Sequence, residues 1–143
     1  IIFDSIKLLA NNGIYNINTD LIIGIPNTSI DTVKEDLDFL LALPITHISC
    51  YTLILEERTL LSHQINNNII TLLDDDTVAD MYLYSKDRII NSGFTHYEIS
   101  NFAKPGFLSI HNMLYWNEEE YIGCGMGASS FINNQLMLLE RLI

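Results

Sequence analysis

The chain has 143 residues, of which 48% are hydrophobic and 17% are charged, and this composition excludes an intrinsically disordered polypeptide. Seven basic residues stand against 18 acidic ones, so the formal net charge is −11. Nucleic acids and anionic membranes bind clustered lysine and arginine, so neither is an expected partner. No apolar run reaches the ~18 residues of a membrane-spanning helix. The two widely separated cysteines, Cys50 and Cys124, favour a reducing, cytoplasmic compartment.

The first 55 residues carry the signals of two helices, each followed by a strand. Apolar residues at helical spacing predict a short helix over 6–10, and the isoleucine-rich segment 15–23 predicts a strand. A second helix is predicted to begin at Ser29 and to end before Pro44. Its apolar face comprises Val33, Leu37, Leu40 and Leu41. Residues 45–55 then alternate as a second strand.

The next 46 residues repeat this plan after a long connection over 56–73, for which no element is predicted. Asp74–Asp76 provide an N-cap and an acidic first turn for a third helix that runs to about Asn91. Its buried side comprises Val78, Met81, Tyr82, Ser85 and Ile89. Residues 95–101 are predicted as a third strand. This alternation predicts an α/β fold with a parallel sheet, either open or closed into a barrel.

One face of each predicted strand is unusually polar. These faces comprise Asn16, Asn18, Asp20 and Ile22 in the first strand, His47, Ser49 and Tyr51 in the second, and Glu98 and Ser100 in the third. Buried parallel strands are usually continuous apolar runs, and buried charges need partners, so this pattern favours a ligand inside a barrel. The alternative is that Asp20 caps a neighbouring loop or accepts backbone hydrogen bonds at the sheet edge.

Four segments, in order, resemble the radical S-adenosylmethionine proteins related to oxygen-independent coproporphyrinogen III oxidase. They are NINTDLIIGIP at 16–26, HISCYTL at 47–53, YEISNFAKPG at 97–106 and HNMLYW at 111–116. The last two resemble the branch whose characterised members act as heme chaperones. The resemblance implies that residues 1–106 are the second half of a partial (β/α) barrel. Residues 107–143 would be a truncated post-barrel segment with the HNxxYW motif and a glycine-rich motif.

The resemblance also implies cofactors at the upper rim of the barrel, namely S-adenosylmethionine and a 4Fe–4S cluster. Asp20 matches a family carboxylate that contacts S-adenosylmethionine, and a carboxylate can accept hydrogen bonds from ribose hydroxyls or an ammonium group. Ser129 lies in the glycine-rich segment 123–130, which matches a family segment near this cofactor, although relatives often carry histidine there. The Cys-x-x-x-Cys-x-x-Cys motif that holds the cluster is absent from this sequence. Cys50 is instead predicted as a core residue.

The HNxxYW segment resembles the motif tied to heme binding in the chaperone branch. His111 is the candidate ligand of the heme iron, because a neutral imidazole is a competent axial ligand. Asn112, Tyr115 and Trp116 would support the porphyrin. The alternative is a packing motif, in which the aromatic pair is buried and His111 caps a turn.

Three functions remain open at this point. The first is a heme-binding chaperone that delivers heme to an acceptor protein, here incomplete. The second is oxygen-independent coproporphyrinogen III oxidase, and the third is a fragment without activity, so the sequence leaves open whether the protein is an enzyme. The edge of a partial barrel needs either the rest of the barrel or a partner such as a second copy of the chain. We expect the 143 residues alone to bind S-adenosylmethionine weakly.

Overall fold

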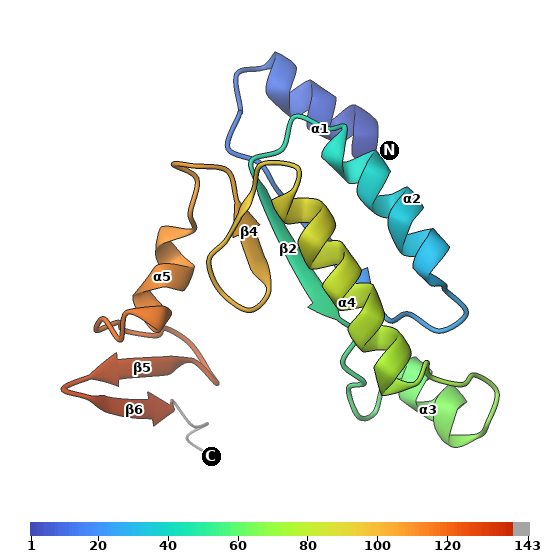
Figure 1. Cartoon of the computed structure of the whole chain (residues 1–143). Coiled ribbons are helices and arrows are strands. Elements are labelled where there is room, and N and C mark those ends of the chain that lie inside the picture. Colours follow the sequence, from blue (N-terminus) through green and yellow to red (C-terminus); the bar gives the residue numbers. More distant parts are fainter. Residues whose placement is uncertain (139–143) are drawn as a thin grey trace. The chain divides into compact units, whose positions relative to one another are not determined.

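A computed structural model describes residues 1–138 of the chain (Figure 1). It divides into two units, Ile1–Phe107 and a second unit that begins at Leu108, and each is described by itself. The last five residues of the predicted post-barrel segment, 139–143, lie outside the described residues.

A four-stranded sheet forms the centre of the first unit. Its strands are β1 (Asn18–Ile23), β2 (His47–Thr52), β3 (Thr95–His96) and β4 (Asn101–Ala103), in the spatial order β1-β2-β4-β3. β1 and β2 are parallel, with Asn18 opposite His47 and Ile23 opposite Thr52. Because α2 (Ile30–Leu41) connects them, the predicted strand–helix–strand unit and the α/β class are confirmed.

Two helices, α2 and α4, begin where the capping signals predict. Ser29 caps α2 and forms a reciprocal capping box with Thr32. Asp74 caps α4 (Asp75–Ile90) by accepting the Thr77 backbone N–H at 2.9 Å. Hydrogen bonds from Thr77 also hold the pKa of the Asp74 carboxyl below its usual value. Both predicted helix starts are therefore confirmed.

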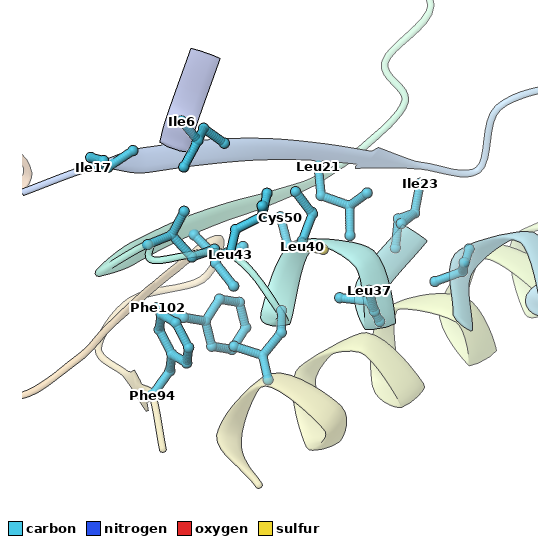
Figure 2. Packing of buried hydrophobic residues seen from close by; sticks show 14 of the residues in the cluster. Ile6, Ile17, Leu21, Ile23, Leu37, Leu40, Leu43, Cys50, Phe94 and Phe102 are labelled. Atoms are coloured by element: carbon cyan, nitrogen blue, oxygen red, sulfur yellow. The ribbon is translucent and has the colours of Figure 1, made fainter. Parts of the chain in front are cut away.

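An apolar cluster joins α2 and α4 to one face of the sheet (Figure 2). Its fully buried members include Leu37 from α2, Ile48 from β2, Met81 from α4 and Phe102 from β4. Cys50 is 1% exposed, and burial raises the pKa of its thiol to about 11. Cys50 is thus a core residue, as its position within a predicted strand indicates.

The third predicted strand is wrong in extent, because only its first two residues, β3, run in the direction of β2. Residues 95–101 do not form one parallel strand, because the chain turns back after His96. β4 runs antiparallel to both β2 and β3. The Tyr97 N–H bonds the Asn101 carbonyl at 3.3 Å, and the Glu98 carboxylate accepts the Ser100 N–H at 3.1 Å. These local bonds stabilise a tight reversal that an alternating pattern does not reveal.

Two helical predictions also need correction. The connection over 56–73 contains α3 (Leu60–Asn66), which begins where the Thr59 side chain accepts the Ser62 N–H. In α1 (Ile2–Asn11), Ile6 is buried. Leu8 and Leu9, which are among the apolar residues that predict this helix, are 64% and 39% exposed. Leu8 and Leu9 therefore contribute little to the core of this unit.

The described residues of the second unit form a short helix and a hairpin. α5 (Ile110–Trp116) is followed by β5 (Ser129–Ile132) and β6 (Gln135–Leu138), which pair antiparallel. Asn133 and Asn134 join the strands with φ values of 52° and 58°. Asparagine tolerates this left-handed conformation, and two such residues match the twist of a two-residue hairpin. Neither the helix nor the hairpin was predicted from the sequence.

Candidate functional site

The polar residues of β1 and β2 form one strip on the sheet face opposite the apolar cluster. The register places Asn18 beside His47, Asp20 beside Ser49, and Ile22 beside Tyr51. Asn18, Asp20 and Ile22 are exposed, while Ile17, Leu21 and Ile23 belong to the apolar cluster. The predicted alternation of faces in these two strands is therefore confirmed.

Hydrogen bonds connect this strip to the reversal after β3. The His47 ring lies between two partners, Asn18 Oδ1 at 2.6 Å from Nδ1 and the Tyr97 hydroxyl at 2.7 Å from Nε2. Asn18 Nδ2 donates to Asp20 Oδ1 at 2.8 Å, and Ser49 Oγ donates to Asn18 Oδ1 at 3.3 Å. Asp20 thus pairs with a side chain of its own strand, which differs from the predicted alternative of a loop cap or backbone bonds.

His47 is 6% exposed, and burial lowers the pKa of its imidazole below the usual value. The charges of Asp20 and Glu98 oppose this shift without cancelling it. The neutral imidazole is therefore the form that the folded chain favours.

This shift predicts that acidification destabilises the chain. Between the lowered pKa of folded His47 and its unfolded value of about 6.5, the unfolded chain binds more protons. The free energy of unfolding should therefore fall as pH decreases below about 6.5, until folded His47 is itself protonated. Urea unfolding from about pH 8 to about pH 5 should show a smaller fall for His47→Gln than for the unmodified chain. In a His96→Gln control, the free energy of unfolding should fall with pH as much as in the unmodified chain. An identical decrease in all three proteins would contradict the prediction.

A small cavity lies where β1 and β2 end. It has a volume of about 300 Å³ and is lined by Ile22, Tyr51, Thr52, Leu53, Ile54 and Ser100. The carboxyl ends of parallel strands are where barrel proteins bind ligands. Gly24 shapes the adjacent turn with φ +77°, and a Cβ there would lie 3.2 Å from the Val78 side chain. The structure therefore supports a turn-forming role for this glycine.

In the second unit, α5 presents the HNxxYW residues on neighbouring faces. His111 and Tyr115 are one helical turn apart, and the Tyr115 hydroxyl lies 3.2 Å from His111 Nε2. Asn112 is half-buried, whereas Tyr115 and Trp116 are 46% and 53% exposed. Ser109 caps the helix, so His111 does not have the turn-capping role of the alternative interpretation.

A series of aromatic rings connects α5 to the hairpin. The His111 and Tyr115 rings are 5.0 Å apart, Tyr115 and Tyr121 are 4.7 Å apart, and Tyr121 and Phe131 are 6.3 Å apart. Tyr121 and Phe131 also exchange two backbone hydrogen bonds of 2.9 Å. Sequence analysis missed Tyr121 and Phe131, and only their positions on either side of the glycine-rich segment could have suggested them.

Two cavities lined by described residues adjoin this ring series. One, of about 600 Å³, is lined by His111, Tyr115, Tyr121, Ile122, Gly123, Ala128 and Ser129. The other, of about 500 Å³, is lined by Tyr115, Glu118, Glu119, Tyr121, Phe131 and Asn134. The structure therefore brings His111, Tyr115 and Ser129 to one cavity, and Asn112 and Trp116 are not among its lining residues.

The described residues offer no thiolate set for an iron–sulfur cluster. No group of three or more histidine, cysteine, aspartate or glutamate side chains in residues 1–138 is arranged to hold a metal ion. Cys50 is buried in β2, and Cys124 is exposed in the second unit. A single imidazole such as His111 still suffices for an axial heme ligand.

No protein-family model matches the chain. The fold matches that of coproporphyrinogen III oxidase of Escherichia coli, a radical S-adenosylmethionine enzyme, with a TM-score of 0.69 at 17% identity. The match covers 92% of this chain and 33% of that enzyme. The chain thus has the α/β fold of part of a radical S-adenosylmethionine protein.

Comparison of sequences identifies relatives of the chain within the radical S-adenosylmethionine proteins. The chain is 40% identical over 131 residues to the heme chaperone HemW of Lactococcus lactis, covering 92% of the chain and 35% of the relative. It is 34% identical over 131 residues to HemW of Bacillus subtilis, covering 92% of the chain and 35% of that protein. It is also 34% identical over 128 residues to the mouse mitochondrial radical S-adenosyl methionine domain-containing protein 1. This match covers 87% of the chain and 29% of the mouse protein. The chain is homologous to the HemW heme chaperones and their radical S-adenosylmethionine relatives, and it spans about a third of their length.

None of the helices within residues 1–138 combines the length and the apolar composition of a membrane-spanning segment.

Proposed function

We propose that this chain is part of a heme-binding chaperone that delivers heme to an acceptor protein. The observation that carries the proposal is the placement of His111, whose exposed imidazole borders a 600 Å³ cavity walled by Tyr115 and Tyr121. An imidazole can ligate heme iron, and aromatic faces can pack against a porphyrin. The names of the HemW relatives support the same function.

Within this proposal, the two units have different tasks. Residues 1–106 form the barrel part, where Asp20 accepts hydrogen bonds from S-adenosylmethionine. Residues 107–143 form the post-barrel segment, where His111 is the candidate iron ligand, with Asn112, Tyr115 and Trp116 supporting the porphyrin. Ser129 borders the His111 cavity, and the family resemblance makes its backbone a second candidate contact for S-adenosylmethionine. The 4Fe–4S cluster of the family would need ligands other than those of residues 1–138.

The partners follow from the same proposal. Heme and an acceptor protein are the partners, and the net charge of −11 argues against nucleic acid. We place the protein in the cytoplasm. A homodimer is the assembly that would cover the edge of the barrel part by means of a second copy.

Replacing His111 with alanine should weaken heme binding by the chain at least about tenfold, since an iron–imidazole bond is lost. Heme titration followed by absorption spectroscopy measures the dissociation constant and the ligand-sensitive heme bands. His63→Ala is the matched control, because His63 is also an exposed helical histidine but lies on α3 in the first unit. Unchanged affinity and spectrum in His111→Ala would remove His111 as the iron ligand.

The fold favours one alternative function, oxygen-independent coproporphyrinogen III oxidase, because the structural match is to that enzyme. An anaerobic assay of the protein with coproporphyrinogen III tests it. Formation of the decarboxylated product would support the enzyme, whereas no product together with His111-dependent heme binding would support the chaperone.

A further inference from the structure

A chain of hydrogen bonds crosses the polar strip from Tyr97 to Asp20. The Tyr97 hydroxyl lies 2.7 Å from His47 Nε2, His47 Nδ1 lies 2.6 Å from Asn18 Oδ1, and Asn18 Nδ2 lies 2.8 Å from Asp20 Oδ1. These residues come from three separate segments, namely β1, β2 and the reversal after β3. The central His47 side chain is buried, whereas Asp20 at the end is exposed and within reach of a ligand.

The Asp20 carboxylate fixes the direction of every hydrogen bond between Tyr97 and Asp20. An ionised carboxylate only accepts hydrogen bonds, so the Asn18 amide must turn its NH₂ group toward Asp20. Its carbonyl oxygen then faces both His47 and the Ser49 hydroxyl, and it accepts from both. The reversed amide would place an oxygen against the carboxylate.

The direction of the Asn18 amide also fixes the tautomer of His47. Since Asn18 Oδ1 is an acceptor, His47 Nδ1 carries the proton. A neutral imidazole then has an unprotonated Nε2, which accepts the hydrogen bond from the Tyr97 hydroxyl. All donors therefore point toward Asp20, and the buried histidine serves as a neutral link between the reversal and β1.

We propose that His47 and Tyr97 are positioning residues that hold the Asp20 carboxylate, through Asn18, in the orientation that receives a hydrogen-bond donor. Asn18 donates to Asp20 Oδ1, and the Asp20 side chain is exposed, so its second oxygen, Oδ2, is the atom that would receive the ligand's hydrogen bond. The ligand group must itself carry donors, as a ribose diol or an ammonium group does, whereas a phosphate or carboxylate would be repelled. This inference rests on the proposed role of Asp20 in binding S-adenosylmethionine.

The ring nitrogens of His47 provide the first test. In the ¹⁵N-labelled 143-residue chain at about pH 7.5, above the ordinary histidine pKa, NMR should show a protonated Nδ1 and an unprotonated Nε2. Tyr97→Phe should shift His47 toward the tautomer mixture of a free imidazole. Tyr82→Phe is the matched control, because the Tyr82 hydroxyl holds the same reversal through the Ile99 carbonyl at 2.6 Å. An unprotonated Nδ1 in the unmodified chain, or equal shifts in both variants, would overturn the proposal.

Titration of the same chain with S-adenosylmethionine, followed by amide NMR shifts, provides the second test. Tyr97→Phe and His47→Gln should each raise the dissociation constant about fivefold, the effect of one lost hydrogen bond. Asp20→Asn should raise it more than about tenfold, and Tyr82→Phe less than about twofold. Weak binding by Asp20→Asn with unchanged binding by Tyr97→Phe would overturn the positioning role. Unchanged binding by Asp20→Asn would instead overturn the proposed role of Asp20, and the tautomer of His47 would still decide whether the hydrogen-bond chain exists.

Discussion

Replacing Phe102 with alanine is expected to lower the free energy of unfolding of the chain by about 3–5 kcal/mol. Phe102 is fully buried in β4, opposite Ile48 of β2, and its ring stacks on His96 with centroids 4.5 Å apart. Figure 2 shows it beside Phe94 at one end of the apolar cluster. Alanine would remove the ring and leave a cavity between the sheet and its helices, because a close-packed core relaxes only in part.

Urea unfolding measures this loss. The matched control is Phe39→Ala, because Phe39 is 47% exposed on α2 and its truncation should cost less than about 1 kcal/mol. Equal losses of unfolding free energy in Phe102→Ala and Phe39→Ala would contradict the burial of Phe102 of β4 in the apolar cluster.

Gly123→Ala should disrupt the hairpin of the second unit. A Cβ at this position would overlap the carbonyl oxygen of Ser129, a backbone atom that cannot move without displacing β5. It would also disturb the hydrogen bond of 3.0 Å from the Gly123 N–H to Ser130 Oγ. We expect this unit to lose about 1–3 kcal/mol of stability or more, because overpacking against backbone is relieved only by moving the strand.

Fluorescence of Trp116, the only tryptophan in the sequence, reports on this unit. Its unfolding midpoint in urea should fall in Gly123→Ala. Gly127→Asn is the control, because no heavy atom lies within 4 Å of a Cβ there and asparagine tolerates its φ of +77° better than most residues. A midpoint in Gly123→Ala equal to that of the unmodified chain would contradict the close approach of residues 123 and 129.

The sequence predicts correctly those features that depend on contacts between residues close together in the sequence. Ser29 and Asp74 cap helices because their side chains satisfy free backbone N–H groups within three residues. The parity of β1 and β2 follows from alternation in sequence alone, and it placed Asn18, Asp20 and His47 on one face.

The predictions fail where the structure depends on contacts between residues far apart in the sequence. Residues 95–101 alternate like a strand, yet they reverse, and Tyr97 of this reversal bonds His47, which is 50 positions away in the sequence. The ring series through residues 111, 115, 121 and 131 has no regular period, so no helix or strand pattern predicts it. The site residues of the second unit were therefore named from a resemblance, and the cavity that surrounds His111 became visible only in the folded chain.

The most direct test of heme binding through His111 compares heme with iron-free protoporphyrin IX. Both porphyrins can pack against the aromatic rings, but only heme offers iron to the imidazole. The unmodified chain should bind heme at least about tenfold more tightly than the iron-free porphyrin, and His111→Ala should bind both alike. Equal affinity of the unmodified chain for the two porphyrins, or an unchanged preference for heme in His111→Ala, would contradict the account.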